Sequence, residues 1–207
     1  MYNLFYYNID KMSDELYETE MAKLPKIRRN EILKKKDIQD RKLSLAGDML
    51  VRKYISRLYG IPKEQLIFAN GEHGKPYVVN APAHFSVSHS LKYTVVAISN
   101  VPIGIDTEVI KQFPAIVAHK LFNDAEKAYI SGNSPFRRKS QMEKAFFEIW
   151  TAKEAYLKYK GLGLSGGISS LSFEGGAFKI TPNDKEIKLS YDYGVPGAVT
   201  AIVTAAK

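Results

Sequence analysis

The segment FFEIWTAKEAYLKYKG, residues 146–161, predicts the last part of a long helix that stops at Gly161. A short strand pattern follows at residues 168–173. Residues 43–60 have the same layout, because a helical pattern ends at a glycine and is followed by a short strand at 66–68. The repeated order of helix, glycine and strand suggests an internal duplication.

We therefore predict an α+β fold made of two similar halves, residues 1–103 and 104–207, related by a pseudo-twofold axis. In each half we expect a long helix packed on a small, mostly antiparallel sheet. Residues 84–88 and 93–99 predict one hairpin of such a sheet. No linker composition separates the halves, so we expect a tight interface that holds the active site.

The composition is typical of a globular protein, with 207 residues, 45% hydrophobic and 25% charged. This excludes a disordered chain, a collagen and a coiled-coil rod. The chain has no cysteine, which excludes disulfides, thiolate metal sites and a cysteine nucleophile. The first ten residues lack a signal-peptide pattern and no long apolar run occurs, so we expect a cytoplasmic protein without a membrane partner. A cysteine-free secreted protein is the alternative.

The positive charge of the chain is concentrated in one segment. Lys and Arg number 30 against 22 Asp and Glu, a net charge of +8, and residues 23–42 hold nine basic and three acidic side chains. Such a segment attracts nucleic acid, an anionic membrane, an acidic protein or a phosphorylated ligand, or it is simply a solvated helix face. The sequence has no helix-turn-helix, RRM or zinc-finger pattern, so we expect no nucleic-acid partner.

Two carboxylates stand two residues apart in Gly104-Ile105-Asp106-Thr107-Glu108. On a strand, Asp106 and Glu108 point to the same side, where they repel each other unless a cation lies between them. Mg²⁺ typically takes one or two carboxylates together with substrate phosphates. The alternative is a pair of exposed acids on an edge strand.

The long helix carries a second candidate group, because Trp150, Glu154 and Lys158 share one stripe at i, i+4 and i+8. Glu154 could supply a third carboxylate for the metal, and Lys158 an ammonium for a phosphate. The alternative is an ordinary surface ion pair between Glu154 and Lys158.

Two further residues could bind a phosphate group. His89 stands at the end of the strand HFSVSHS, where it could donate a hydrogen bond to a phosphate or assist proton transfer; the alternative is a core histidine. Lys75 lies in Gly74-Lys75-Pro76, where glycine and proline make a stiff turn. Such a tripeptide is usually no more than a turn.

The order and spacing of these motifs resemble the 4′-phosphopantetheinyl transferase superfamily, and in particular its Sfp-type branch. The resemblance covers about residues 24–173. It is carried by four motifs: Gly74-Lys75-Pro76, Ser88-His89-Ser90, GIDTE at 104–108 and WTAKE at 150–154, the last continued by Lys158 and Gly161.

The resemblance implies an enzyme, a holo-carrier-protein synthase. It would move the phosphopantetheine arm of coenzyme A to a serine of an apo peptidyl or acyl carrier protein, with Mg²⁺, and release adenosine 3′,5′-bisphosphate. Members of the Sfp-type branch activate nonribosomal peptide synthetases. They consist of two similar halves with the site between them, so we expect a monomer.

The resemblance also carries roles over to single residues. The positions that match metal ligands are Asp106, Glu108 and Glu154. The positions that match coenzyme A contacts are Lys75, Ser88, His89 and Lys158, with Arg28 and Ser44 matching by position only. Catalytic roles are expected for Glu154 as the base, directly or through water, for Lys158 at the leaving phosphate, and for His89.

Two positions depart from the family pattern. Thr107 stands where an aliphatic residue is common, but on a strand it points away from the two acids. Leu43 stands where a basic residue is common. We therefore expect Arg41 or Lys42 to bind the nucleotide instead.

Overall fold

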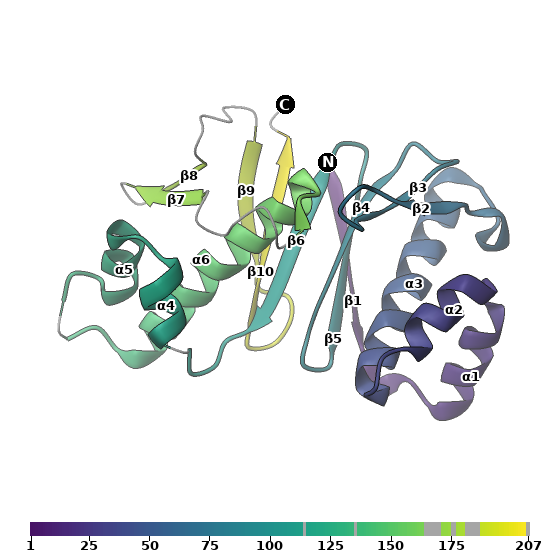
Figure 1. Ribbon diagram of the computed structural model, residues 1–207, viewed down its shortest axis with the longest axis horizontal. Coiled ribbons are helices and arrows are strands. Elements are labelled where there is room, and N and C mark those ends of the chain that lie inside the picture. Colours follow the sequence, from purple (N-terminus) through teal and green to yellow (C-terminus); the bar gives the residue numbers. More distant parts are fainter. Residues whose placement is uncertain (114, 135, 164–170, 175–176, 181–186, 206–207) are drawn as a thin grey trace. The chain divides into compact units, whose positions relative to one another are not determined.

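The computed structural model describes residues 1–205 except for 114, 135, 164–170, 175–176 and 181–186 (Figure 1). The chain forms two compact units. The first comprises residues 1–71 and 76–101, and the second comprises residues 72–75 and 102–207. The prediction of two halves, 1–103 and 104–207, put the short segment 72–75 in the first half, whereas this segment lies with the second unit.

The first unit combines three helices with an antiparallel sheet. Its elements are β1 (Tyr2–Asn8), η1 (Ile9–Lys11), α1 (Asp14–Lys23), α2 (Lys26–Leu33), α3 (Ile38–Tyr59), η2 (Lys63–Gln65), β2 (Phe68–Asn70), β3 (Pro76–Val78), β4 (His84–Ser90) and β5 (Tyr93–Ser99). The sheet has the order β1-β5-β4, and β2 pairs with β3. The predicted hairpin of β4 and β5 is confirmed.

Helix α3 spans 22 residues and ends as expected, with Gly60 in the left-handed conformation at φ 69°. The sequence offers Asp40, just before the leucine pattern that begins at Leu43, as a plausible start, but the helix begins earlier and the Asp37 side chain caps it. Helical spacing from Leu43 to Leu58 predicts one row of side chains that face the core, and Leu43 and Leu50 of this row are buried. Leu58 was expected to face the core, but it lies in the last turn and is 51% exposed.

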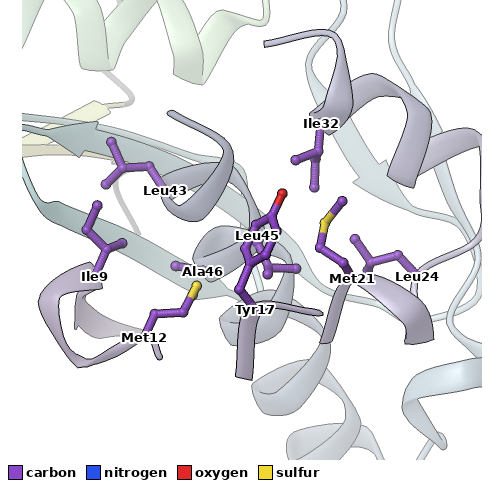
Figure 2. Packing of buried hydrophobic residues seen from close by; sticks show 9 residues of the cluster. All are labelled: Ile9, Met12, Tyr17, Met21, Leu24, Ile32, Leu43, Leu45 and Ala46. Carbon is purple, nitrogen blue, oxygen red and sulfur yellow. The ribbon is translucent and has the colours of Figure 1, made fainter. Parts of the chain in front are cut away.

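Helices α1 and α2 pack on the beginning of α3 through one buried cluster (Figure 2). Its members come from η1, from α1 and α2 and their connections, and from α3: Ile9, Met12, Tyr17, Met21, Leu24, Ile32, Leu43, Leu45 and Ala46. Ser13 caps α1 by accepting a hydrogen bond from the Leu16 amide at 3.1 Å. Leu24 and Ile32 of this cluster belong to the basic segment 23–42, so the cluster packs this segment against the rest of the first unit.

The second unit has the same kinds of element. They are β6 (Ile103–Val109), α4 (Ala115–Leu121), α5 (Asp124–Ser131), α6 (Lys139–Lys160), β7 (Leu171–Glu174), β8 (Ala177–Ile180), β9 (Ile187–Asp192) and β10 (Ala198–Ala205). One sheet has the order β6-β10-β9, and β7 pairs with β8. All of these pairs are antiparallel. Each unit therefore contains one 22-residue helix and a three-stranded antiparallel sheet.

The helical pattern of the sequence covers residues 139–160, and helix α6 has these limits, with Gly161 ending it at φ 70°. Strand patterns at residues 168–173, 178–181, 187–193 and 198–203 predict a meander, in which each strand pairs with the next. This prediction is only partly correct. Strand β10 pairs with both β6 and β9, so the last strand of the chain occupies the centre of its sheet. The sequence Gly175-Gly176 predicts a hairpin turn, and these two residues lie outside the described part of the chain. No described helix is long and apolar enough to span a membrane.

Candidate active site in the second unit

The site begins with a close approach between strand β6 and helix α6. A Cβ atom on Gly104 would collide with the backbone oxygen of Ala155 and the backbone nitrogen of Tyr159. Only glycine lets the helix lie this close to the strand. Because side chains alternate along a strand, Asp106 and Glu108 point to the same side as Gly104 and therefore face α6.

An ion pair joins the two predicted motifs across this contact. Lys158 Nζ donates a hydrogen bond to Asp106 Oδ1 at 2.7 Å, and Asp106 is only 6% exposed. The lysine therefore reaches from the helix to the strand, which the alternative of a simple Glu154–Lys158 surface pair does not explain. On the other face of β6, the hydroxyls of Thr107 and Thr200 are hydrogen-bonded at 2.9 Å, as expected for a residue that points away from the acids.

Glu154 adds a third carboxylate. Its Oε1 atom is buried and accepts no hydrogen bond from any described residue. Burial raises the pKa of the Glu154 carboxyl; the charges of Asp106 and Glu108 raise it further, and Lys158 lowers it. The three carboxylates are thus close enough to repel one another, which is the electrostatic condition that a bound cation relieves.

The chemistry of this donor set fits Mg²⁺, because all three side chains offer oxygen ligands and one of them has a buried oxygen without a donor. Within the described part of the chain, however, no three His, Asp or Glu side chains are already arranged as a metal centre. The Lys158 ammonium instead forms an ion pair with Asp106. Asp106, Glu108 and Glu154 therefore stay a predicted ligand set.

The segment 72–75 brings a second lysine to this region. Lys75 Nζ donates to the carbonyl oxygen of Ile103, at the start of β6, at 2.9 Å. Its Cδ atom lies 3.8 Å from where a Cβ of Gly161 would be, so the turn packs against the end of α6. Burial and the positive charge of Lys158 lower the pKa of Lys75 to about 8. Lys75 and Lys158 thus lie close enough for their positive charges to interact, and such a pair of ammonium groups suits phosphate oxygens.

Sequence reasoning missed a buried ion pair beside these residues. Lys153 Nζ lies 2.9 Å from both carboxylate oxygens of Glu126, and the two side chains are 1% and 0% exposed. Burial lowers the pKa of Lys153, and Glu126 opposes this shift. The available signal was a lysine within the WTAKE motif on an otherwise buried helix face, which needs a partner.

Two other predicted residues lie on strand β4 of the first unit. His89 is exposed, so the alternative of a buried core histidine is wrong. It pairs with Thr94 of β5, whose hydroxyl donates to the Leu43 carbonyl oxygen at 3.0 Å. His89 thus lies on the face of the sheet that α3 covers. Ser88 points the opposite way and is buried.

Arg28 and Ser44 were predicted to bind coenzyme A by position alone. Arg28 Nε donates to Asp48 Oδ2 at 2.7 Å, and another of its nitrogens donates to Glu31 at 2.9 Å. Arg28 therefore already links α2 to α3. Ser44 is 6% exposed, on α3 next to Leu43.

The basic segment divides into two groups. Five side chains donate to acceptors within the first unit: Lys23, Arg28, Arg29, Arg41 and Lys42. Lys42 Nζ donates a hydrogen bond to Asp14 Oδ1 at 2.9 Å, and Arg41 Nε donates to the carbonyl oxygen of Lys35 at 2.7 Å. The two residues expected to bind the nucleotide therefore have structural partners. Four lysines are exposed and form no ion pair in the described part of the chain: Lys26, Lys34, Lys35 and Lys36.

Comparison with known protein families accounts for nearly the whole chain. A family model described as the 4′-phosphopantetheinyl transferase superfamily matches residues 102–203. A second, described as 4′-phosphopantetheinyl transferase, N-terminal, matches residues 11–101. The chain belongs to the 4′-phosphopantetheinyl transferase superfamily.

Curated relatives are named as 4′-phosphopantetheinyl transferases. The chain is 38% identical over 134 residues to the 4′-phosphopantetheinyl transferase gsp of Aneurinibacillus migulanus, a match that covers 65% of the chain and 54% of the relative. It is 35% identical over 135 residues to the 4′-phosphopantetheinyl transferase Sfp of Bacillus subtilis, covering 65% and 58%. The chain spans little more than half the length of these relatives. A holo-acyl-carrier-protein synthase structure from Thermotoga maritima aligns with a TM-score of 0.40 at 19% identity, covering 52% of this chain and 64% of that one, which is too weak to carry an argument.

Proposed function

We propose that this protein transfers the 4′-phosphopantetheine group of coenzyme A to a serine hydroxyl of an apo carrier protein. The observation that carries the proposal is the 2.7 Å contact between Lys158 and Asp106, with the Glu154 carboxylate beside it, in a chain of this superfamily. The contact supports the proposal because it brings together an ammonium and carboxylates, which are the kinds of group that binding and cleavage of a pyrophosphate need.

The proposed reaction forms one bond and breaks another. The serine oxygen bonds to the phosphorus that carries pantetheine, and the bond from that phosphorus to the bridging oxygen of the pyrophosphate breaks. Adenosine 3′,5′-bisphosphate leaves with the bridging oxygen. Glu154, directly or through a water molecule, takes the serine proton, and its raised pKa makes it a better base than an ordinary carboxylate. Lys158 stabilises or protonates the leaving phosphate.

Asp106, Glu108 and Glu154 would hold Mg²⁺. The ion, when bound, offsets negative charge on the pyrophosphate oxygens. For this arrangement the Lys158 ammonium moves from Asp106 to the phosphate, and the carboxylate becomes available to the metal. The Lys158–Asp106 pair is then the resting arrangement of two groups that separate when the substrate binds.

Coenzyme A needs further contacts. We propose that Lys75, Ser88 and His89 bind it, with Arg28 and Ser44 as weaker candidates. The exposed lysines Lys34, Lys35 and Lys36 suit the 3′-phosphate better than Arg28 does, because Arg28 already binds two carboxylates. We further propose a cytoplasmic monomer that acts on peptidyl or acyl carrier proteins, as in nonribosomal peptide synthesis, and that binds no nucleic acid.

Intact-protein mass spectrometry tests the proposal. The protein is incubated with coenzyme A, Mg²⁺ and a panel of apo carrier proteins. We expect a gain of ~340 Da on at least one carrier, the mass of one phosphopantetheine group. A carrier whose acceptor serine is replaced by alanine is the matched control and should gain nothing. Asp106→Ala should fold and give no transfer. No mass gain on any carrier with the folded wild-type protein would refute the proposal.

A further inference from the structure

Lys153 is a charged residue on a face of α6 that is otherwise apolar or aromatic and buried. It shares a face of α6 with four other side chains at helical spacing, all apolar or aromatic and all buried: Phe146, Ile149, Tyr156 and Leu157. A charged group at the centre of such a face costs free energy of desolvation that a methionine or leucine would not. Packing alone therefore does not explain why a lysine occupies position 153.

The ammonium of Lys153 lies where three groups of another segment meet. It donates to Glu126 Oε2 at 2.9 Å and lies 5.0 Å from the centre of the Phe122 ring. The same Oε2 atom accepts from the Asn123 amide at 2.9 Å, as part of the capping box that starts α5. The lysine thus binds the beginning of α5 at one specific point.

This contact defines one rotation of α6 relative to α5 and so adds to the Gly104 contact, which sets the face of α6 that meets β6. Apolar side chains tolerate sliding and rotation, but a buried ion pair is favourable only when its two partners meet. Lys153 directly precedes Glu154, about 100° away around the helix. When Lys153 is held on Glu126, Glu154 and Lys158 are directed towards β6, where Lys158 meets Asp106.

We propose that the Lys153–Glu126 pair is a positioning device that holds the helix carrying Glu154 and Lys158 in its productive orientation. The inference rests on the proposed function for its kinetic consequences, but the orientation of α6 can be measured without activity. Neither residue touches the reacting groups. Their effect on the reaction is exerted through Glu154 and Lys158.

The test is the double variant Glu126→Gln with Lys153→Met. Glutamine can still accept the Asn123 amide, and methionine has nearly the length of lysine, so capping and volume are kept while both charges are lost. Such a replacement commonly leaves a protein folded, whereas removing one partner alone leaves a buried charge unpaired. We expect a melting temperature within about 4 °C of wild type.

In the folded double variant we expect kcat to fall by about 10- to 100-fold, because small displacements of catalytic groups have effects of this size. The Mg²⁺ concentration for half-maximal rate should rise, and KM for coenzyme A should change little. Ile130→Val, on the same face of α5 but with the ion pair intact, is the control and should keep the wild-type values. A folded double variant with wild-type kcat and Mg²⁺ dependence, or an equal loss in the control, would overturn the inference.

Amide hydrogen exchange separates this inference from the proposed function. We expect faster exchange over residues 150–158 in the double variant than in wild type or Ile130→Val. If the wild-type protein shows no transfer, the proposed function fails, and exchange alone decides the positioning role. Unchanged exchange over these residues would contradict it.

Discussion

Gly104 of β6 lies against the backbone of Tyr159 on α6 so closely that no side chain fits between them. The contact determines which face of the strand meets which face of the helix. It brings the acids of GIDTE and the charged stripe of the WTAKE helix together, although the two motifs are separated by more than 40 residues of sequence. The glycine of the first motif is thus a requirement of the site's geometry.

The first prediction concerns this glycine. Gly104→Ala should lower the free energy of unfolding by more than about 3 kcal/mol, because the new methyl group collides with backbone that cannot move aside. Gly47→Ala is the control, because its new methyl would lie 3.0 Å from the Val87 side chain, which can adjust. There the helix propensity of alanine offsets the crowding, and the change should stay within about 1 kcal/mol. Urea unfolding of both variants measures the difference, and equal stabilities would contradict the close approach.

The second prediction concerns pH. The pKa of Lys75 is lowered to about 8, so between that pH and its ordinary pKa the unfolded chain binds the proton and the folded protein does not. Stability therefore rises with pH through this window. Lys75→Met should abolish this contribution, so that the stability of wild type relative to the variant rises by about 1 kcal/mol from pH 7 to about pH 10. Urea unfolding of both proteins across this range gives the difference. A constant or falling difference would show that Lys75 titrates normally.

The third prediction separates two groups in the basic segment. Arg28→Ala should destabilise the protein by about 2 kcal/mol, because the largely buried Asp48 carboxylate loses its hydrogen-bonded partner and keeps only Arg52, whose Nε lies 4.0 Å away. The triple variant Lys34→Ala, Lys35→Ala, Lys36→Ala should keep its melting temperature, because these side chains are exposed and form no ion pair in the described structure.

Steady-state kinetics of the same variants distinguish the two groups further. The triple variant should raise KM for coenzyme A more than KM for dephospho-coenzyme A, because only coenzyme A carries the 3′-phosphate. Arg28→Ala should affect both substrates alike. Equal effects of the triple variant on both substrates would exclude these lysines from binding the 3′-phosphate.

Much of the fold follows from local sequence. The limits of α6 and the glycine ends of both long helices are encoded within a few residues, as is the hairpin of β4 and β5. Alternation along β6 correctly placed Asp106 and Glu108 on one side and Thr107 on the other. Helical spacing correctly placed Glu154 and Lys158 on one stripe. Periodicity alone is sufficient for these relationships.

The remainder depends on contacts between distant segments. The Arg28–Asp48 and Lys153–Glu126 pairs join residues 20 and 27 positions apart, and no periodic pattern indicates them. Helix propensity likewise does not predict the ion pair between Lys42 and Asp14. The central place of β10 depends on pairing with β6, which begins almost 100 residues earlier. Sequence order therefore suggested a meander where the sheet has a different strand order.

The most direct test of the account compares Glu154→Gln with Lys158→Met, by measuring the rate of pantetheine transfer to a carrier protein against Mg²⁺ concentration. Glu154→Gln should reduce the rate strongly at every concentration and shift half-saturation upward, because it removes both the predicted base and a predicted ligand. Lys158→Met should lower kcat at saturating Mg²⁺ while half-saturation stays the same or falls, because Asp106 loses its ammonium partner. If both variants keep wild-type rates at saturating Mg²⁺ and coenzyme A, these residues form a structural pair and the proposed active site is wrong.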